Sequence, residues 1–222
     1  MEPFRFKQFT VRHEASPMRV GTDGVTLGVL APATGRVLDV GCGCGLIGLM
    51  LAQRGAERVE MIDIDSAAAA EASTNAAASP WNERLSVSQA NFLTFNTPER
   101  FDSIVSNPPF FGTGLAAPDE RRAAARLDSS MPPEAFMRKA AELLAPGGTV
   151  SVIIPADREQ IWLAAGAFAG LHAREIIEIK TKATAPPKRT VLILSSESPT
   201  PQRRLLLLNS PEFKQLTNPF YL

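Results

Sequence analysis

The sequence predicts an α/β fold in which a central, mostly parallel sheet of seven strands carries helices on both faces. Short apolar runs alternate with helical patterns along the chain, and this alternation is typical of consecutive βαβ units. The chain of 222 residues is 45% hydrophobic, so it can bury one sizeable core. A glycine-rich turn at residues 41–45 follows the first expected strand. We therefore expect one α/β domain over residues 36–222, preceded by an extension over residues 1–35.

The first half of the domain predicts four strands, and the first two of them are each followed by a helix. The strands are short apolar runs, and the second helix is rich in alanine. This order favours parallel neighbours in the sheet. The expected elements are, in order, strand 36–40, helix 46–54, strand 58–63, helix 66–77, and strands 85–89 and 103–106.

The second half begins with a helix that has a start signal and a stop signal. Pro132-Pro133-Glu134 opens it, and Pro146-Gly147-Gly148 stops it after about residue 145. We expect a final antiparallel pair of strands to close one edge of the sheet, and a hairpin in the extension to turn near residues 15–17. The elements expected after this helix are strand 149–154, helix 161–169, and the paired strands 172–180 and 190–195.

Composition excludes several classes of protein. Lys plus Arg and Asp plus Glu both number 23, so the zero net charge argues neither for a nucleic-acid arm nor for an acidic tail. The amino terminus lacks the apolar core of a signal peptide and no later run approaches a membrane span, so we expect a cytoplasmic protein. Cys42 and Cys44 are one residue apart, which would strain a disulfide and would leave a metal short of ligands. We expect no bound metal.

The turn after the first strand predicts a nucleoside-containing cofactor. Gly41, Gly43 and Gly45 let the backbone approach a ligand and direct helix-start N–H groups towards it. Asp63 ends the second strand, so it faces the same crevice and is placed to hold a ribose diol, although the neighbouring Asp65 is an alternative. The glycine spacing differs from that of dinucleotide-binding turns, and the acidic Asp39 suits a cation better than a pyrophosphate. These features favour S-adenosylmethionine over NAD.

The stretch after strand 103–106 predicts a site for a planar group that bears an amino nitrogen. The Asn107 amide oxygen can accept a hydrogen bond from an amine, and Pro108 and Pro109 leave only carbonyl acceptors on a stiff turn. Phe110 can stack on a base, a contact worth roughly 1–3 kcal/mol for a nucleobase. Transfer of an activated methyl group to such an amine needs orientation more than a strong base. The alternative is a strand-terminating turn with core phenylalanines.

Together, the glycine loop and Asn107-Pro108-Pro109 resemble the class I S-adenosylmethionine-dependent amino-group methyltransferases, which have a Rossmann-like fold. A closer resemblance, over nearly the whole chain, is to the bacterial family that methylates N6 of the adenine 3′ of the anticodon in a valine tRNA. By that resemblance Thr22 and Asp23 join the cofactor pocket. The stretches that carry this closer resemblance are 6–9, 18–24, 79–81, 107–109 and 220–222.

The expected cofactor set also includes Ile64, Asn91 and Phe92, with the Asn91 carbonyl oxygen on the adenine amine of the cofactor. The resembling family usually has Asp at the position of Asn91 and Tyr at that of Phe110. Asn-Pro-Pro-Phe also resembles enzymes that methylate the guanine N2 amine in ribosomal RNA, and related motifs occur in methyltransferases of a protein glutamine. An NAD-dependent oxidoreductase or a catalytically silent RNA-binding module would fit the sequence less well.

The neutral total charge conceals an uneven distribution. Residues 55–75 contain five acids and one base, whereas residues 174–204 contain seven bases and three acids. A basic face of this kind can neutralise phosphates of a tRNA partner, and a solvated surface is the alternative. The expected tRNA contacts are Lys180, Lys182, Lys188 and Arg189, with Arg121, Arg122 and Arg126 after the Asn107 motif, where a flipped base would enter.

Overall fold

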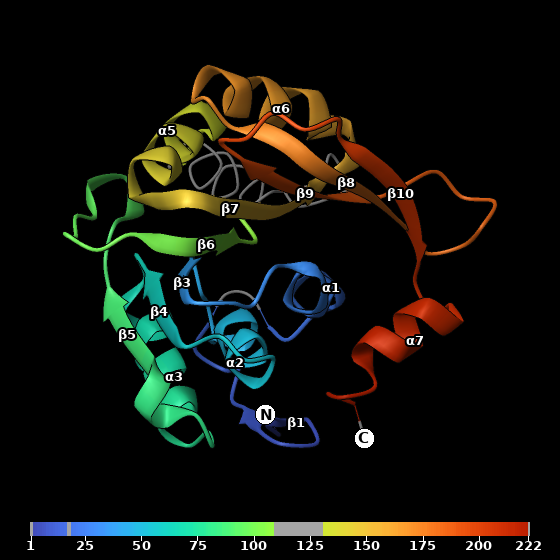
Figure 1. Ribbon diagram of the computed structural model, residues 1–222. Helices are drawn as coiled ribbons and strands as arrows, with labels where there is room; N and C mark the ends of the chain where they lie inside the picture. Colours follow the sequence, from blue (N-terminus) through green and yellow to red (C-terminus); the bar gives the residue numbers. More distant parts are fainter. Residues whose placement is uncertain (1, 17–18, 109–130, 222) are drawn as a thin grey trace, which may run out of the picture.

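A computed structural model describes residues 2–16, 19–108 and 131–221 of the chain. One large mixed sheet crosses the molecule, with helices on both sides (Figure 1). Its strands are β3 (Arg36–Val40), β4 (Arg58–Asp63), β5 (Leu85–Gln89), β6 (Phe101–Ser106), β7 (Leu144–Pro155), β8 (His172–Lys180), β9 (Arg189–Ser195) and β10 (Gln202–Leu207). They are arranged in the order β10-β8-β9-β7-β6-β3-β4-β5.

The sheet is mostly parallel, as predicted, but it has eight strands rather than seven. From β5 to β7 all neighbours are parallel, and β9 lies antiparallel between β7 and β8. The expectation that the β8–β9 pair closes the edge is wrong, because β10 adds outside β8 in a parallel register. β10 begins Gln-Arg-Arg, so it lacks a continuous apolar pattern. Ion pairs of Arg203 with Glu178 and of Arg204 with Glu175 help to fix it on β8.

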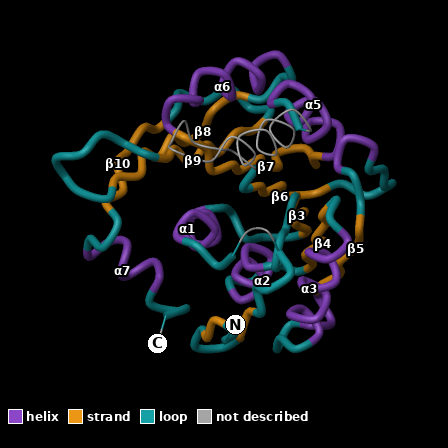
Figure 2. Tube along the Cα trace, turned by 180° about the vertical axis from the view of Figure 1, so that it is seen from behind, coloured by secondary structure: helices purple, strands orange, loops and turns teal. Residues whose placement is uncertain are grey.

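The helices form one layer on each face of the sheet. On one face, α5 (Pro133–Leu143) and α6 (Glu159–Phe168) cover an apolar cluster that contains Phe136 and Trp162. The other face carries α1 (Thr22–Leu30), α2 (Leu46–Gln53) and α3 (Ser66–Ala77), and α7 (Pro211–Thr217) lies on the same side. The view from behind shows the same two layers (Figure 2). Four of these helices were predicted, whereas α1 and α7 were not.

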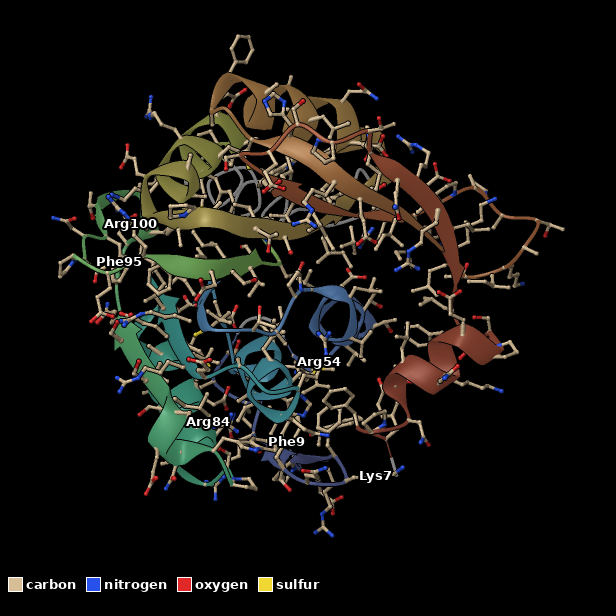
Figure 3. The ribbon with its side chains drawn as sticks, viewed as in Figure 1. Lys7, Phe9, Arg54, Arg84, Phe95 and Arg100 are labelled. Atoms are coloured by element: carbon tan, nitrogen blue, oxygen red, sulfur yellow. The ribbon has the colours of Figure 1, made fainter. Side chains whose placement is uncertain are left out.

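An arginine fixes the unpredicted helix α1 next to α2. Arg54, at the end of α2, donates from Nη1 to the carbonyl oxygens of Gly28 and Ala31 at the end of α1, at 2.8 and 2.6 Å (Figure 3). These carbonyls would otherwise lack an intrahelical partner. Burial lowers the pKa of the Arg54 guanidinium. The contact holds α1 against α2, and the first turn of α1 contributes to the cavity described below.

The amino-terminal extension does contain a hairpin, but its turn is not where the sequence predicted. β1 (Phe4–Arg5) pairs antiparallel with β2 (Thr10–Val11), and the chain reverses over residues 6–9. The reason is aromatic packing, since the Phe6 ring stacks on Phe9 at 4.6 Å and on Tyr221 at 5.8 Å. The two chain ends therefore lie side by side, and Lys7 and Phe9 mark this corner in Figure 3. Residue 17 of the expected turn lies outside the described residues.

Among the helices of the described ranges, none is long and apolar enough to cross a membrane.

Candidate active site

The carboxyl ends of two neighbouring strands bring the glycine loop and Asn107 together. β3 and β6 are parallel neighbours, with Val40 opposite Ser106, so the next residue of each strand enters the same crevice. The Ser106 hydroxyl donates to the Val40 carbonyl at 2.8 Å and holds the two ends together. From β3 the chain continues to β4 on one side, whereas β6 lies on the other side. Ligands of open α/β sheets bind at such a switch point.

A cavity of about 330 Å³ lies at this point. It brings together five of the predicted site residues, which come from the extension, the glycine loop and the end of β6. These are Thr22, Asp23, Gly41, Gly43 and Asn107. The rest of the wall consists of Arg19, Gly21, Gly24, Cys42, Cys44 and the first residues of α2, Leu46 and Ile47. Gly45, Asp39, Asp63, Ile64, Asn91, Phe92 and Pro108 are not part of this wall.

The loop itself is shaped by glycines in the left-handed region. Gly41, Gly43 and Gly45 have φ values of 68°, 55° and 82°, which residues other than glycine rarely adopt. A Cβ on Gly41 would meet nothing within 4 Å, so the backbone there is open to a ligand. At Gly45 a Cβ would lie 3.3 Å from the Ala72 Cβ, so this glycine permits close packing of the loop on α3.

Asp63 and Asp65 have different structural roles. Asp63 accepts from the Gly43 N–H through Oδ2 at 2.8 Å and from the Asp65 N–H through Oδ1 at 2.9 Å. The Asp65 carboxylate caps α3, accepting from the N–H groups of Ala67 and Ala68. Asp63 therefore contacts the glycine loop directly, and a carboxylate has lone pairs for further donors. Ile64, between the two acids, is 58% exposed.

Asp39 lies beneath the glycine loop and is not part of the cavity wall. Its side chain is fully buried, and Oδ2 accepts from the Gly48 N–H of α2 at 2.9 Å. Oδ1 has no hydrogen-bond partner among the described residues. Burial raises the pKa of Asp39 to about 7, the Gly48 N–H opposes this rise, and the charge of Asp63 adds to it. Any electrostatic interaction between Asp39 and the expected cationic cofactor would therefore act across the loop, without direct contact.

Asn91 and Phe92 lie beyond the end of β5, away from the cavity wall. The Asn91 Oδ1 accepts from the Leu93 N–H at 3.0 Å and so caps the short 3-10 helix η2 (Phe92–Thr94). The Phe92 ring is 4% exposed and packs against Phe136 with centroids 5.0 Å apart. In the described structure, the Phe92 ring is part of the core.

Asn107 lines the cavity and carries a buried acceptor atom. The residue is 7% exposed, and its Oδ1 has no hydrogen-bond partner among the described residues. An unsatisfied buried polar atom costs about 1–3 kcal/mol, so a ligand N–H at this oxygen would recover that energy. Pro108 is buried beside it. The expected partners Pro109 and Phe110 lie outside the described residues, as do Arg121, Arg122 and Arg126.

Sequence reasoning missed one contact at this site that spans most of the chain. The Arg189 Nε, at the start of β9, donates to Asp23 Oδ2 at 2.8 Å. No local signal could reveal this pair. The two thiols of the wall, Cys42 and Cys44, are buried, and burial raises the pKa of both, that of Cys44 to about 11. Both thiols are therefore protonated near neutral pH and are poor nucleophiles.

The part of the chain that the structure describes holds no group of three or more His, Cys, Asp or Glu side chains that could bind a metal ion.

Comparison with known proteins identifies the family. The model of the methyltransferase small domain family matches residues 21–162. A tRNA1(Val) (adenine(37)-N6)-methyltransferase of Bacteroides thetaiotaomicron is 39% identical over 229 residues, which cover 99% of this chain and 97% of the relative. The likeness to this curated enzyme thus covers nearly the whole of both proteins.

Solved structures show the fold. A predicted O-methyltransferase of Agrobacterium tumefaciens aligns with a TM-score of 0.66 at 22% identity, covering 89% of this chain and 96% of that one. The glycopeptide N-methyltransferase MtfA, solved with S-adenosylmethionine, aligns with a TM-score of 0.59 at 12% identity, covering 82% and 100%. The Rossmann-like class I fold predicted from the sequence is therefore confirmed. On the family match and on its likeness to the curated relative, the chain belongs to the methyltransferase small domain family of S-adenosylmethionine-dependent methyltransferases.

Proposed function

We propose that this protein transfers a methyl group from S-adenosylmethionine to N6 of adenine 37 in a valine tRNA. The observation that carries the proposal is the buried Oδ1 of Asn107, which has no hydrogen-bond partner among the described residues and belongs to a residue of the same cavity wall as the glycine loop. An amine is a donor that suits this oxygen. The identity of 39% to a tRNA1(Val) (adenine(37)-N6)-methyltransferase over nearly the whole chain supports the choice of adenine in tRNA.

The residues of the crevice fit a cationic nucleoside as methyl donor. Gly41 leaves open space over the loop, and Asp63 offers a carboxylate for a ribose beside Gly43. Asp39 Oδ1, which has no hydrogen-bond partner among the described residues, lies beneath the loop, and a positive ligand would stabilise the ionised form of this carboxyl group. S-adenosylmethionine supplies a methyl group on a positively charged sulfur. A pyrophosphate would be repelled by the carboxylate of Asp63 at the same loop, which disfavours NAD.

Asn107 has the central role in the proposed chemistry. Its Oδ1 accepts one hydrogen of the target amine and thereby draws the nitrogen lone pair away from delocalisation into the base. It also fixes the direction in which the amine approaches the methyl group, and orientation of this kind accounts for much of the rate of a two-reactant step. The protonated Cys42 and Cys44 thiols take no part as nucleophiles. The surplus proton of the product leaves to solvent.

The surface that we propose for tRNA is smaller than the sequence suggested. Arg203 is paired with Glu159 and Glu178, and Arg204 with Glu212, so these charges are already neutralised. Lys182 and Lys188, on the connection between β8 and β9, are exposed to solvent. Their ammonium groups are therefore the better candidates for contacts with phosphates.

Because Arg189 contacts Asp23, this connection ends near the cavity. We propose that its lysines, with Lys180 at the end of β8, contact the tRNA backbone. A tRNA substrate also implies a cytoplasmic location.

A methyl-transfer assay tests the proposed base. The substrates are an unmodified valine tRNA transcript and a matched transcript with guanine in place of adenine 37, each incubated with labelled S-adenosylmethionine. We expect one label per molecule as N6-methyladenosine in the first transcript and none in the second. Label as N2-methylguanosine would favour an RNA guanine target, and the absence of label in both transcripts would contradict the RNA proposal.

A further inference from the structure

We propose that Glu71 of α3 is a positioning residue for the cofactor pocket, and that it acts through the amino-terminal segment 12–16. The pocket wall begins with Arg19, Gly21 and Thr22, which belong to the extension and not to the α/β sheet. Contacts with the rest of the fold are needed to hold this part of the extension over the crevice. The inference rests on the proposed position of the cofactor, and it assigns a role to a residue that does not line the cavity.

One carboxylate binds three consecutive backbone donors. Glu71 Oε1 accepts from the N–H groups of Glu14 and Ala15 at 2.6 and 3.0 Å, and Oε2 accepts from Ser16 at 2.9 Å. Segment 12–16 is not part of a helix or strand. Hydrogen bonds to a charged acceptor are about twice as strong as neutral ones. Glu71 is therefore an anchor of this segment, because it binds three consecutive residues of it.

Asn75, one helical turn later on the same face of α3, joins the same segment to the glycine loop. Its Oδ1 accepts from the Arg12 N–H at 2.9 Å, and its Nδ2 donates to the carbonyl oxygens of Arg12 and Cys44 at 2.8 and 2.9 Å. Asn75 is 2% exposed, and Cys44 is part of the cavity wall. Two polar residues of an otherwise alanine-rich helix therefore bind the extension to the loop.

The connection to the wall continues through His13. This residue lies between the segment positions that Asn75 and Glu71 hold, and its Nδ1 accepts from the Val20 N–H at 3.1 Å. Val20 stands between Arg19 and Gly21, both of which line the cavity. A continuous path of contacts along the chain thus leads from Glu71 to the pocket wall. Loss of the Glu71 carboxylate should release residues 14–16 and loosen the wall without changing any atom that touches the cofactor.

The test compares Glu71→Gln with Glu83→Gln. Glu83, in the short 3-10 helix η1 (Asn82–Arg84), is exposed and contacts no backbone N–H of the described part of the extension, so its replacement removes the same charge without the anchor. For Glu71→Gln we expect the dissociation constant of S-adenosylmethionine, measured by calorimetry, to rise about tenfold. Hydrogen exchange of a peptide over residues 12–16 should become faster. The turnover number at saturating cofactor should remain close to that of the wild type, and Glu83→Gln should match the wild type throughout.

Two outcomes would overturn the inference. One is an unchanged cofactor affinity with faster exchange at residues 12–16, which would make the anchor purely structural. The other is unchanged exchange, which would mean that Glu71 does not hold the segment. An Asp63→Ala variant in the same experiment distinguishes a failure of this inference from a failure of the proposed cofactor pocket. If Asp63→Ala loses affinity for S-adenosylmethionine while Glu71→Gln does not, the proposed pocket is supported and only the proposed role of Glu71 is contradicted.

Discussion

Arg189 and Asp23 form an ion pair of 2.8 Å across 166 residues of sequence. Asp23 lines the cavity at the start of α1, and Arg189 begins β9 directly after the exposed Lys188. The pair therefore joins the wall of the cofactor cavity to the connection that we propose for tRNA. The sequence places Arg189 and Lys188 on the same expected phosphate-binding face. The structure separates them, because the Arg189 guanidinium already contacts a carboxylate.

The first prediction concerns this ion pair. Arg189→Gln removes the charge that holds Asp23, so the affinity for S-adenosylmethionine should fall by roughly threefold, the scale of a partly exposed pair. Lys188→Ala is the matched control and should leave cofactor affinity unchanged. Calorimetric titration of both variants with the cofactor provides the measurement. Equal affinities for wild type and Arg189→Gln would mean that Asp23 keeps its position without the guanidinium.

The second prediction concerns tRNA. Lys188→Ala removes an exposed cation, so it should weaken binding of different tRNA species by a similar factor and flatten the log–log salt dependence by roughly one unit if one phosphate contact is lost. Binding is measured at several salt concentrations for wild type and variant. Parallel salt dependences with equal affinity would show that this lysine is only part of the solvated surface.

The third prediction separates the two acids after β4. Asp63 contacts the glycine loop, so Asp63→Ala should greatly weaken cofactor binding. Asp65 caps α3, so Asp65→Ala should cost about 1 kcal/mol in the free energy of unfolding and have a smaller effect on binding. Urea unfolding and calorimetry on both variants measure these effects. A larger loss of cofactor affinity in Asp65→Ala would reverse the assignment of the ribose.

The fourth prediction is a pH dependence of stability. Burial raises the pKa of Asp39 from 3.8 to about 7, so between these pH values the folded protein holds a proton that the unfolded chain releases. The stability of the wild type should therefore fall as pH rises through this range. Asp39→Asn keeps an oxygen for the Gly48 N–H but takes up no proton. From pH 5 to pH 8, the wild type should lose about 1 kcal/mol or more relative to the variant.

Urea unfolding of both proteins at the two pH values measures this difference. Free energies of unfolding that change in parallel would mean that Asp39 is not protonated in the folded protein at pH 5.

The local elements of the fold could be predicted because each carries its signal within a few residues. The strand 36–40 and the helix 66–77 have the predicted bounds. β10 and α7 were missed because tertiary contacts stabilise them: β10 relies on ion pairs with β8, and α7 has only seven residues. The hairpin turn was misplaced because its true position depends on aromatic packing against the far end of the chain.

The difference between local sequence signals and tertiary contacts also explains which parts of the site could be predicted. The glycine loop and Asn107 follow strands that the sequence predicts to be parallel, and the structure makes these strands neighbours, so both segments lie at one crevice. The Glu71 anchor and the Arg189 pair join distant segments, and nothing local marks them. The stretches 6–9, 79–81 and 220–221, which carry much of the family resemblance, form an aromatic cluster, with Phe9 against Trp81 and Phe6 against Tyr221. Their described contacts are structural.

The central claim is that the Asn107 Oδ1 binds the amine that receives the methyl group. The most direct test is the single-turnover rate of methyl transfer to unmodified valine tRNA by Asn107→Ala, with S-adenosylmethionine at saturation and its affinity measured separately. We predict a rate lower by about 10²-fold or more, the scale for loss of one preorganised polar contact, with cofactor affinity close to that of the wild type. A transfer rate equal to that of the wild type would contradict the claim.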